Sequence, residues 1–358
     1  MARADDVMRE EVDGVDTNVS DSITQNEAAV YDRQIRLWGI EAQNKLRHSH
    51  VLIVGMKGLG AEIAKNLVLC GLNSMQLVDP EPTTEDDLLS NFFLSRESIG
   101  LPRGSASLAG VQELNPLVKL TCLSSLKEID YSSFSLVIFT DQPYNVVEEA
   151  DEKCRSLGIR FISASVYGWI GYSFFDFNQH TFRVAKEKPI IYAELDGATE
   201  VEKEESDTIV EDEEDKYENK KLEYSSFHDT MNVEWQTKKL IRKAKGLLPS
   251  AYFPIRAILR SESNNRLCGD ETKDIETLTE LWRNELENAN QSEDGQTILP
   301  DQFDYLLGPQ LSATCAVLGG FVGQESIKAL TEGKLPLRNL LIYSALDTTA
   351  RVCHFPPK

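Results

Sequence analysis

The sequence predicts an α/β fold, a doubly wound sheet of the Rossmann-like type, on three observations. Short apolar runs typical of buried parallel strands recur along the first half of the 358-residue chain. Helical patterns separate these runs. The first run ends in a glycine-rich turn, from Gly55 to Gly60, that opens directly into a helical pattern. This alternation favours a sheet covered by helices on both faces.

The expected elements follow from their periodicity. Strands are expected at residues 51–54, 75–78, 118–122, 136–139 and 160–162. Helices are expected at residues 61–70, 105–114, 146–157 and 274–287, with a further helix from Leu311. Small residues in this last segment predict close packing against a neighbouring backbone: Ala316, Gly319, Gly320 and Gly323.

A helix is also expected before the first strand. Thr24 and Glu27 have the spacing that lets each side chain cap the other's free backbone amide at a helix start. The helix would carry the sequence AAVYDRQIRLW and end at Gly39, and a second short helix would reach about Arg47.

Charge divides the chain into regions. With 58 acidic against 37 basic residues, a nucleic-acid partner held by phosphate contacts is excluded. Residues 194–223 form an acidic run, expected to be a solvated, mobile loop, with a docking role as the alternative. The expected division is a disordered N-terminus (1–23), a first α/β part (24–195), an acidic and basic insertion with a helical segment (196–300) and a second α/β part (301–358).

The insertion also contains a basic cluster between Lys238 and Lys245. This cluster is either a solvated helix face or a nuclear import signal. The six cysteines form no CxxC pair and the histidines no HExxH motif, so no protein-bound zinc is expected, and no metal site is assigned to this chain. Without a signal peptide or a bilayer-spanning apolar run, we expect a soluble intracellular chain with no membrane partner.

The glycine-rich turn is the first candidate site. Gly55, Gly58 and Gly60 are placed to form a phosphate cradle at a helix N-terminus. Asp79, nineteen residues past Gly60, stands where a ribose-binding carboxylate is expected. Lys57, however, puts a long side chain where a nucleotide needs bare backbone.

A more specific motif precedes the turn. YDRQIRLWG, followed by a strand and GxxGLGAEIAKNL, resembles the ThiF/MoeB-like adenylation domain of ubiquitin-like-protein activating enzymes over residues 26–194 and 299–347. Within that family the chain is similar to the smaller, non-thiolating subunits of SUMO-activating enzymes. This resemblance implies a heterodimer with a thiolating subunit, SUMO as the substrate protein, and ATP and magnesium bound mainly by the partner.

Three departures from an active adenylation domain support this resemblance. Lys57 replaces a loop glycine, and the NRQ segment that supplies a phosphate-binding arginine is missing after Asn91. Of the D-N-x-x-x-R motif only Asp141 remains, either as a magnesium ligand or, as we favour, a solvated carboxylate at a strand end. No cysteine is followed by threonine, as a thioester-forming cysteine typically is, and Cys154 is expected to be a buried apolar residue.

Arg33 in YDRQ is the candidate catalytic residue. The resemblance implies that this arginine reaches across a pseudo-twofold interface to the ATP phosphates bound by the other subunit. A planar guanidinium that stays charged suits that task. The alternative is a surface arginine paired with Asp32 or Glu27, and Arg36 is the nearest competitor for the catalytic role.

Three other functions stay open. The chain could be the equivalent subunit for the Rub-type cullin modifier, although those subunits carry a larger insertion. A self-sufficient homodimeric adenylyltransferase would need the missing zinc cysteines and NRQ arginine. A nicotinamide-dependent oxidoreductase would leave YDRQIRLWG unexplained. A nuclear location is expected from the SUMO resemblance and the basic cluster.

Overall fold

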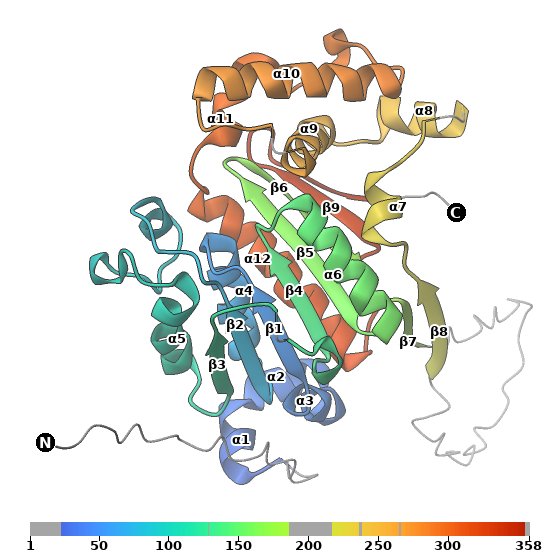
Figure 1. The fold of residues 1–358 in the computed structure, drawn as a ribbon. Coiled ribbons are helices and arrows are strands. Elements are labelled where there is room, and N and C mark those ends of the chain that lie inside the picture. Colours follow the sequence, from blue (N-terminus) through green and yellow to red (C-terminus); the bar gives the residue numbers. More distant parts are fainter. Residues whose placement is uncertain (1–22, 128, 186–216, 236–237, 265, 355–358) are drawn as a thin grey trace, which may run out of the picture.

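The computed structural model describes residues 23–127, 129–185, 217–235, 238–264 and 266–354 (Figure 1). The expectations for residues 1–22 and for the acidic run up to residue 216 lie outside the described residues.

Eight strands form one mixed sheet in the order β10-β9-β6-β5-β4-β1-β2-β3. The five strands expected from the sequence are parallel and adjacent: β1 (His50–Val54), β2 (Ser74–Val78), β3 (Lys119–Leu123), β4 (Leu136–Thr140) and β5 (Arg160–Tyr167). Three antiparallel strands extend the sheet beyond that expectation: β6 (Ile170–Asp176), β9 (Asn339–Ser344) and β10 (Thr349–Cys353).

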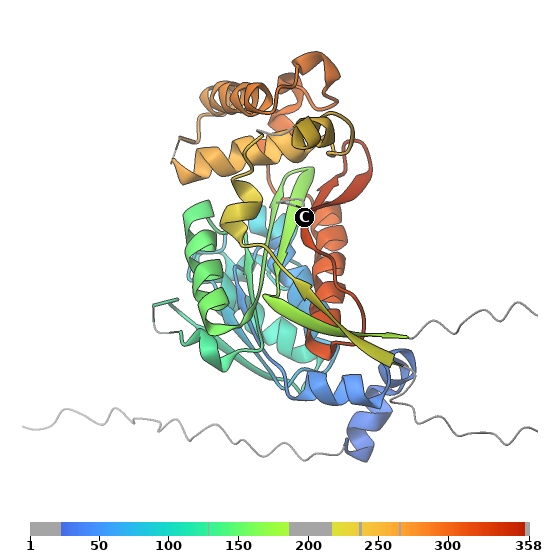
Figure 2. The ribbon, with the colours of Figure 1, turned by 90° about the vertical axis from the view of Figure 1, so that its right-hand side faces the viewer.

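Helices cover both faces of this sheet, so the expected α/β class is confirmed (Figures 1 and 2). One face carries α4 (Gly58–Val68), α5 (Arg103–Leu114) and α12 (Ser312–Thr331), and the other carries α6 (Tyr144–Leu157). Alternate residues of β1 enter the two cores, Val51 and Ile53 on the α4 side and Leu52 and Val54 on the α6 side. Burial on both faces is why β1 reads as a continuous apolar run.

The close approach expected of α12 is confirmed. A Cβ added at Gly319 would lie 2.5 Å from the Cβ of Glu62, and one at Gly323 would lie 2.9 Å from the Cβ of Asn66. Asn66 Nδ2 also donates a hydrogen bond to the Gly319 carbonyl at 3.1 Å. Gly320, by contrast, has no atom within 4 Å of such a Cβ. Two of the glycines therefore bring α12 against α4, the helix that follows the glycine-rich turn.

Three short helices precede the sheet: α1 (Gln25–Val30), α2 (Asp32–Trp38) and α3 (Ile40–Arg47). Thr24 and Glu27 form the expected capping box. The single helix expected up to Gly39 is interrupted at Tyr31, whose side chain is buried. The Tyr31 hydroxyl accepts a hydrogen bond from Asn115 Nδ2 at 2.9 Å, which ties the start of α2 to the body of the protein.

A helical segment lies beyond the carboxyl ends of the parallel strands (Figure 1). Its helices are α7 (Phe227–Met231), α8 (Lys238–Gly246), α9 (Tyr252–Ser263), α10 (Glu271–Asn288) and α11 (Asp304–Leu307). The short 3-10 helices among the described residues are η1 (Asp86–Leu89), η2 (Arg96–Ser98), η3 (Tyr131–Ser133), η5 (Glu293–Gly295) and η6 (Pro300–Gln302). In the described part of the chain, no helix combines the length and apolar character needed to cross a membrane.

A separate two-stranded ribbon pairs β7 (Gln179–Ala185) with β8 (Tyr217–Glu223). The acidic run at residues 194–223 was expected to be a mobile loop. This expectation is wrong for its last seven residues, which form β8. Their backbone groups pair with β7, a strand that the sequence analysis did not anticipate, and this pairing overrides the charged composition.

Candidate functional site

The glycine-rich turn folds as expected between β1 and α4, but its glycines are needed for packing. Gly55 has a positive φ of +96°, and a Cβ there would lie 2.2 Å from the Thr140 carbonyl oxygen. A Cβ at Gly60 would lie 2.1 Å from the Gly55 carbonyl oxygen, and one at Gly58 would lie 2.5 Å from the Cβ of Ser90. These glycines are thus required by the strand–turn–helix geometry whether or not a nucleotide binds.

Asp79 follows β2 and faces the turn, but its carboxylate is already used inside the protein. Asp79 Oδ2 accepts hydrogen bonds from the Met56 amide and from Arg103 Nε, both at 2.8 Å. Its Oδ1 accepts from Arg103 Nη2 at 3.3 Å and from the Glu81 amide at 3.1 Å. The residue expected to bind ribose is therefore the partner of a buried arginine.

Arg103 extends this pair into a network. Its Nη1 donates to Asp87 Oδ2 at 3.0 Å, and Asp79, Arg103 and Asp87 are only 4%, 6% and 5% exposed. Burial raises the pKa of Asp87, but hydrogen bonds from Thr84 and Arg103 outweigh that effect and hold the pKa below its usual value. The sequence analysis missed Arg103, which stands 24 residues from Asp79 and belongs to no motif.

Asn91, after which the sequence analysis expects an NRQ segment to be missing, is buried against the turn. Its Nδ2 donates to the Met56 carbonyl at 2.7 Å and to Ser107 Oγ at 3.2 Å. Its Oδ1 accepts from the Phe93 amide at 2.9 Å. Asn91 therefore supports the glycine-rich turn.

Asp141 lies at the end of β4 with a positive φ of 54°. Its Oδ1 accepts the Val166 amide at 3.0 Å, whereas its Oδ2 is shut off from solvent and has no hydrogen-bond partner among the described residues. Burial raises the pKa of Asp141, and the charge of Lys57 opposes that rise. The expectation of a solvated carboxylate is therefore wrong, because the helical segment covers this strand end.

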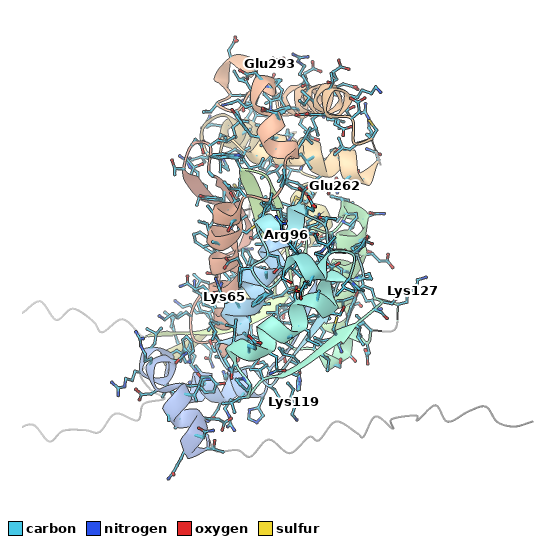
Figure 3. All side chains as sticks on the ribbon, turned by 90° about the vertical axis from the view of Figure 1, so that its left-hand side faces the viewer. Lys65, Arg96, Lys119, Lys127, Glu262 and Glu293 are labelled. Carbon is cyan, nitrogen blue, oxygen red and sulfur yellow. The ribbon has the colours of Figure 1, made fainter. Side chains whose placement is uncertain are left out.

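Glu262, on α9, is a second acidic group that the sequence analysis missed. Its Oε1 accepts a hydrogen bond from the Tyr167 hydroxyl at 3.0 Å, while its Oε2 is buried with no partner among the described residues. Burial raises the pKa of Glu262 to about 7. Figure 3 shows Glu262 at the junction of the helical segment and the sheet. Only the tertiary fold brings it near Asp141, 121 residues earlier in the chain.

These residues do not fit a nucleotide with its magnesium ion. Four carboxyl groups line the cavity beside the turn, those of Asp86, Asp87, Asp141 and Glu262, and a polyphosphate would meet their negative charge. The ribose-binding position is taken by the salt bridge between Asp79 and Arg103. Among the described side chains, no three His, Cys, Asp or Glu residues gather to hold a metal ion.

Arg33 lies on α2, and its side chain is exposed. Both partners considered for it are engaged elsewhere. Asp32 pairs with Arg36, with Arg36 Nη2 3.0 Å from Asp32 Oδ2, and Glu27 pairs with Arg47 at 2.9 Å. Within the described part of the chain, Arg33 forms no ion pair, whereas Arg36 is held by Asp32.

The cysteines do not have the setting of a nucleophile. Cys154 is fully buried, as expected, and burial raises its pKa to about 12. Cys268 is exposed, but its Sγ lies 3.3 Å from the Asp274 carboxylate. An activated thiolate needs an electropositive neighbour, which this acid does not provide.

Comparison with known proteins identifies the relatives of this chain. The model of the ThiF family matches residues 31–358. The chain is 40% identical to the SUMO-activating enzyme subunit aos-1 of Caenorhabditis elegans, covering 94% of this chain and 99% of the relative. It is 32% identical to SUMO-activating enzyme subunit 1 of Homo sapiens, covering 94% and 97%.

Two solved structures share the fold at much lower identity. E. coli MccB superposes with a TM-score of 0.51 at 12% identity, covering 91% of this chain and 71% of MccB. PaaA superposes with a TM-score of 0.54 at 12% identity, covering 96% and 77%. With its full-length match to the subunit 1 sequences, the chain belongs to the ThiF family and, within it, to the SUMO-activating enzyme subunit 1 group.

Proposed function

We propose that this chain is the non-thiolating subunit of a heterodimeric SUMO-activating enzyme. The names of its relatives support this role, and imply a partner subunit and SUMO. The partner would bind ATP and magnesium, adenylate the C-terminal glycine of SUMO and form the thioester on its own cysteine. This chain would supply the interface and Arg33, in trans, to the phosphates. The Rub-type and homodimeric alternatives gain no support from these relatives.

The observation that carries the proposal is that the Arg33 guanidinium forms no ion pair among the described residues. Asp32 and Glu27 are each held by another arginine, so Arg33 is available to an anion outside the chain. Its five donors in a fixed fork suit two phosphate oxygens. As pyrophosphate leaves, negative charge grows on those oxygens, and a fixed cation there stabilises the transition state.

The helix that carries Arg33 is anchored at its N-terminal side. Tyr31 is 2% exposed, and its ring lies over Gly71, where an added Cβ would come within 2.4 Å of the ring. The α1 end is fastened by the salt bridge between Glu27 and Arg47. Because its helix is anchored, Arg33 has less conformational freedom to lose when it binds the phosphates, so binding costs less entropy.

SUMO-dependent exchange between ATP and pyrophosphate tests the proposal. We expect no exchange from this chain alone and robust exchange from the heterodimer. Arg33→Ala in the heterodimer should lower the rate by about 10³-fold, the scale of an arginine finger. Arg36→Ala removes an arginine one turn away that is paired within the chain, and should leave the rate nearly unchanged. Exchange by the isolated chain, or equal rates for both variants, would contradict the proposal.

We also propose a nuclear location, supported by the basic composition of α8 (Lys238–Gly246) and by the SUMO assignment. A fluorescent fusion in which the lysines and arginine of α8 are replaced by glutamine should leave the nucleus. If it stays there, either the partner subunit or another segment carries the signal.

A further inference from the structure

The α2 helix, which carries Arg33, has no buried side chain of its own. It is seven residues long, from Asp32 to Trp38, and none of these fully described residues is buried. A helix of this length is marginal in water, so its position depends on tertiary contacts. The contacts made at its two ends therefore decide where the Arg33 guanidinium is held.

At the N-terminal end, Asn115 connects α2 to the body of the protein. Asn115 is 5% exposed, and its Nδ2 donates to the Tyr31 hydroxyl at 2.9 Å and to the Val68 carbonyl at 2.8 Å. Its Oδ1 accepts a hydrogen bond from the Leu117 amide at 3.2 Å. Both polar atoms of the carboxamide are thus engaged, and Asn115 links the residue before α2 to the last residue of α4.

At the C-terminal end, Gln43 makes a second connection. The Trp38 indole Nε1 donates to Gln43 Oε1 at 3.0 Å, and Gln43 Nε2 donates to the Cys70 carbonyl at 2.9 Å. Gln43 lies on α3 and is 0% exposed, so the loss of either bond would leave a polar group unpaired in the interior. The sequence analysis did not identify this residue.

The two connections end on one short segment, residues 68–71, where α4 finishes. The first ends on the Val68 carbonyl and the second on the Cys70 carbonyl. Gly71 completes the segment with a φ of +79°, and it lies directly against the Tyr31 ring. Both ends of α2 are therefore held by the same part of the protein, which keeps the helix from pivoting about one end.

We propose that residues 68–71 fix the position of α2, and that Asn115 and Gln43 are positioning residues for Arg33. The inference rests on the function proposed above, because it gives the position of Arg33 a catalytic use. A cation stabilises the charge that grows on the leaving pyrophosphate only if it is correctly placed, and a shift of about 1 Å can cost up to about 10²-fold in rate. The positioning residues act through Arg33 and not through the phosphates themselves.

SUMO-dependent exchange between ATP and pyrophosphate by the heterodimer tests the proposal. Gln43→Met keeps the length of the side chain but removes both of its hydrogen bonds, and Tyr31→Phe removes only the hydroxyl that Asn115 binds. Each variant should lower kcat by about tenfold and leave KM for ATP nearly unchanged, because a displaced Arg33 stabilises the transition state less. Normal kcat in both variants would overturn the inference.

Tyr144→Phe is the matched control. The Tyr144 hydroxyl is also a buried acceptor, bound by Asn232 Nδ2 at the same distance of 2.9 Å, but it lies on α6, on the opposite face of the sheet. Its loss should leave kcat unchanged. Equal losses of kcat in Tyr144→Phe and Tyr31→Phe would mean that any buried hydroxyl matters in this way, and would contradict a positioning role.

A double-mutant cycle separates positioning from a general loss of stability. In an Arg33→Ala background there is no guanidinium to position, so adding Gln43→Met or Tyr31→Phe should lower the rate no further. A further tenfold loss would overturn the inference and leave the function proposed for Arg33 standing. An unchanged rate in Arg33→Ala alone would overturn that function, and this inference with it.

Hydrogen exchange on the full-length chain gives a readout that does not depend on activity. In Gln43→Met and Tyr31→Phe the amides of α2 should exchange at least about tenfold faster, while those of β1 stay protected. If exchange shows that one variant is unfolded throughout, the other decides. Unchanged exchange of α2 in a folded variant would show that these hydrogen bonds do not hold the helix.

Discussion

Arg103 binds Asp79 through two guanidinium nitrogens, with Nε 2.8 Å from Oδ2 and Nη2 3.3 Å from Oδ1. This pair occupies the place where a ribose-binding carboxylate was expected. A side chain that could have served a nucleotide instead holds η1 and the start of α5 against the end of β2. Asp79 therefore has a structural role in this chain.

Removing Arg103 should be strongly destabilising. Arg103→Ala leaves Asp79 and Asp87 buried without their cation, and we expect the free energy of unfolding to fall by about 3–5 kcal/mol. Arg36→Ala breaks an exposed ion pair and should cost at most about 0.5 kcal/mol. Urea denaturation of both variants measures the difference. Similar midpoints would show that the buried network contributes little.

Restoring a glycine in the turn should not restore nucleotide binding. In Lys57→Gly the backbone is bare, but Arg103 still binds Asp79 and the carboxyl groups of Asp141 and Glu262 remain. Calorimetric titration of ATP and magnesium into this variant should give no heat of binding, as for the unaltered chain. A measurable affinity would mean that Lys57 alone closes the site.

Two adjacent glycines of α12 should respond in opposite ways. Gly319→Ala forces a Cβ to within 2.5 Å of the Cβ of Glu62 and should destabilise the protein by about 1–3 kcal/mol. Gly320 is exposed, with no atom within 4 Å of an added Cβ, so Gly320→Ala should stabilise the helix by up to about 1 kcal/mol. Thermal melting of both variants tests this contrast. Destabilisation by Gly320→Ala would contradict the packing described for α12.

A buried pair of carboxyl groups should make stability depend on pH. Asp151 lies beside Asp176, and burial, followed by the charge of Asp176, raises the pKa of Asp151 to about 8. An unfolded aspartate has a pKa near 4, so between about pH 4 and pH 8 the folded state binds more protons. Stability should therefore fall as pH rises through this window and level off above it.

Asp151→Asn mimics the protonated acid and should remove most of the loss of stability between about pH 4 and pH 8. Its carboxamide oxygen can still accept the Phe227 amide, which Asp151 Oδ2 accepts at 2.7 Å. We expect the variant to be more stable at neutral pH by on the order of 2 kcal/mol. Melting temperatures across the pH range measure the slope. An unchanged slope would place the titrating group elsewhere.

The sequence predicted the parallel half of the sheet because β1 and β4 are buried on both faces and read as apolar runs. The antiparallel half was missed because its identity depends on partners far away in the chain. β6 pairs with β9, and no local signal links Ile170 to Ser344. The Thr24 capping box was predictable because it acts within one turn of helix. The close approach of α12 was predictable from its small residues, but its partner α4 was not.

The candidate site was less predictable for the same reason. The spacing of Asp79 from Gly60 indicated that Asp79 lies near the glycine-rich turn, as it does, but the sequence did not show its partner, Arg103. Arg103 and Glu262 come to the site only through tertiary packing. The solvation of Asp141 was misjudged because the sequence does not show that α9 covers the end of β4. Local sequence patterns predict where strands end. Which charged residues of different elements pair can be seen only once the fold is known.

The antiparallel β6–β9 pairing has a consequence for synthesis of the chain. After the ribosome has made β6, which is buried along its whole length in the finished protein, one edge of it stays uncovered until β9 follows, from Asn339 to Ser344. At ordinary elongation rates that interval lasts roughly ten to thirty seconds. An apolar strand edge exposed for so long invites pairing with other nascent chains. We therefore expect this protein to depend on chaperones during translation more than its finished stability suggests.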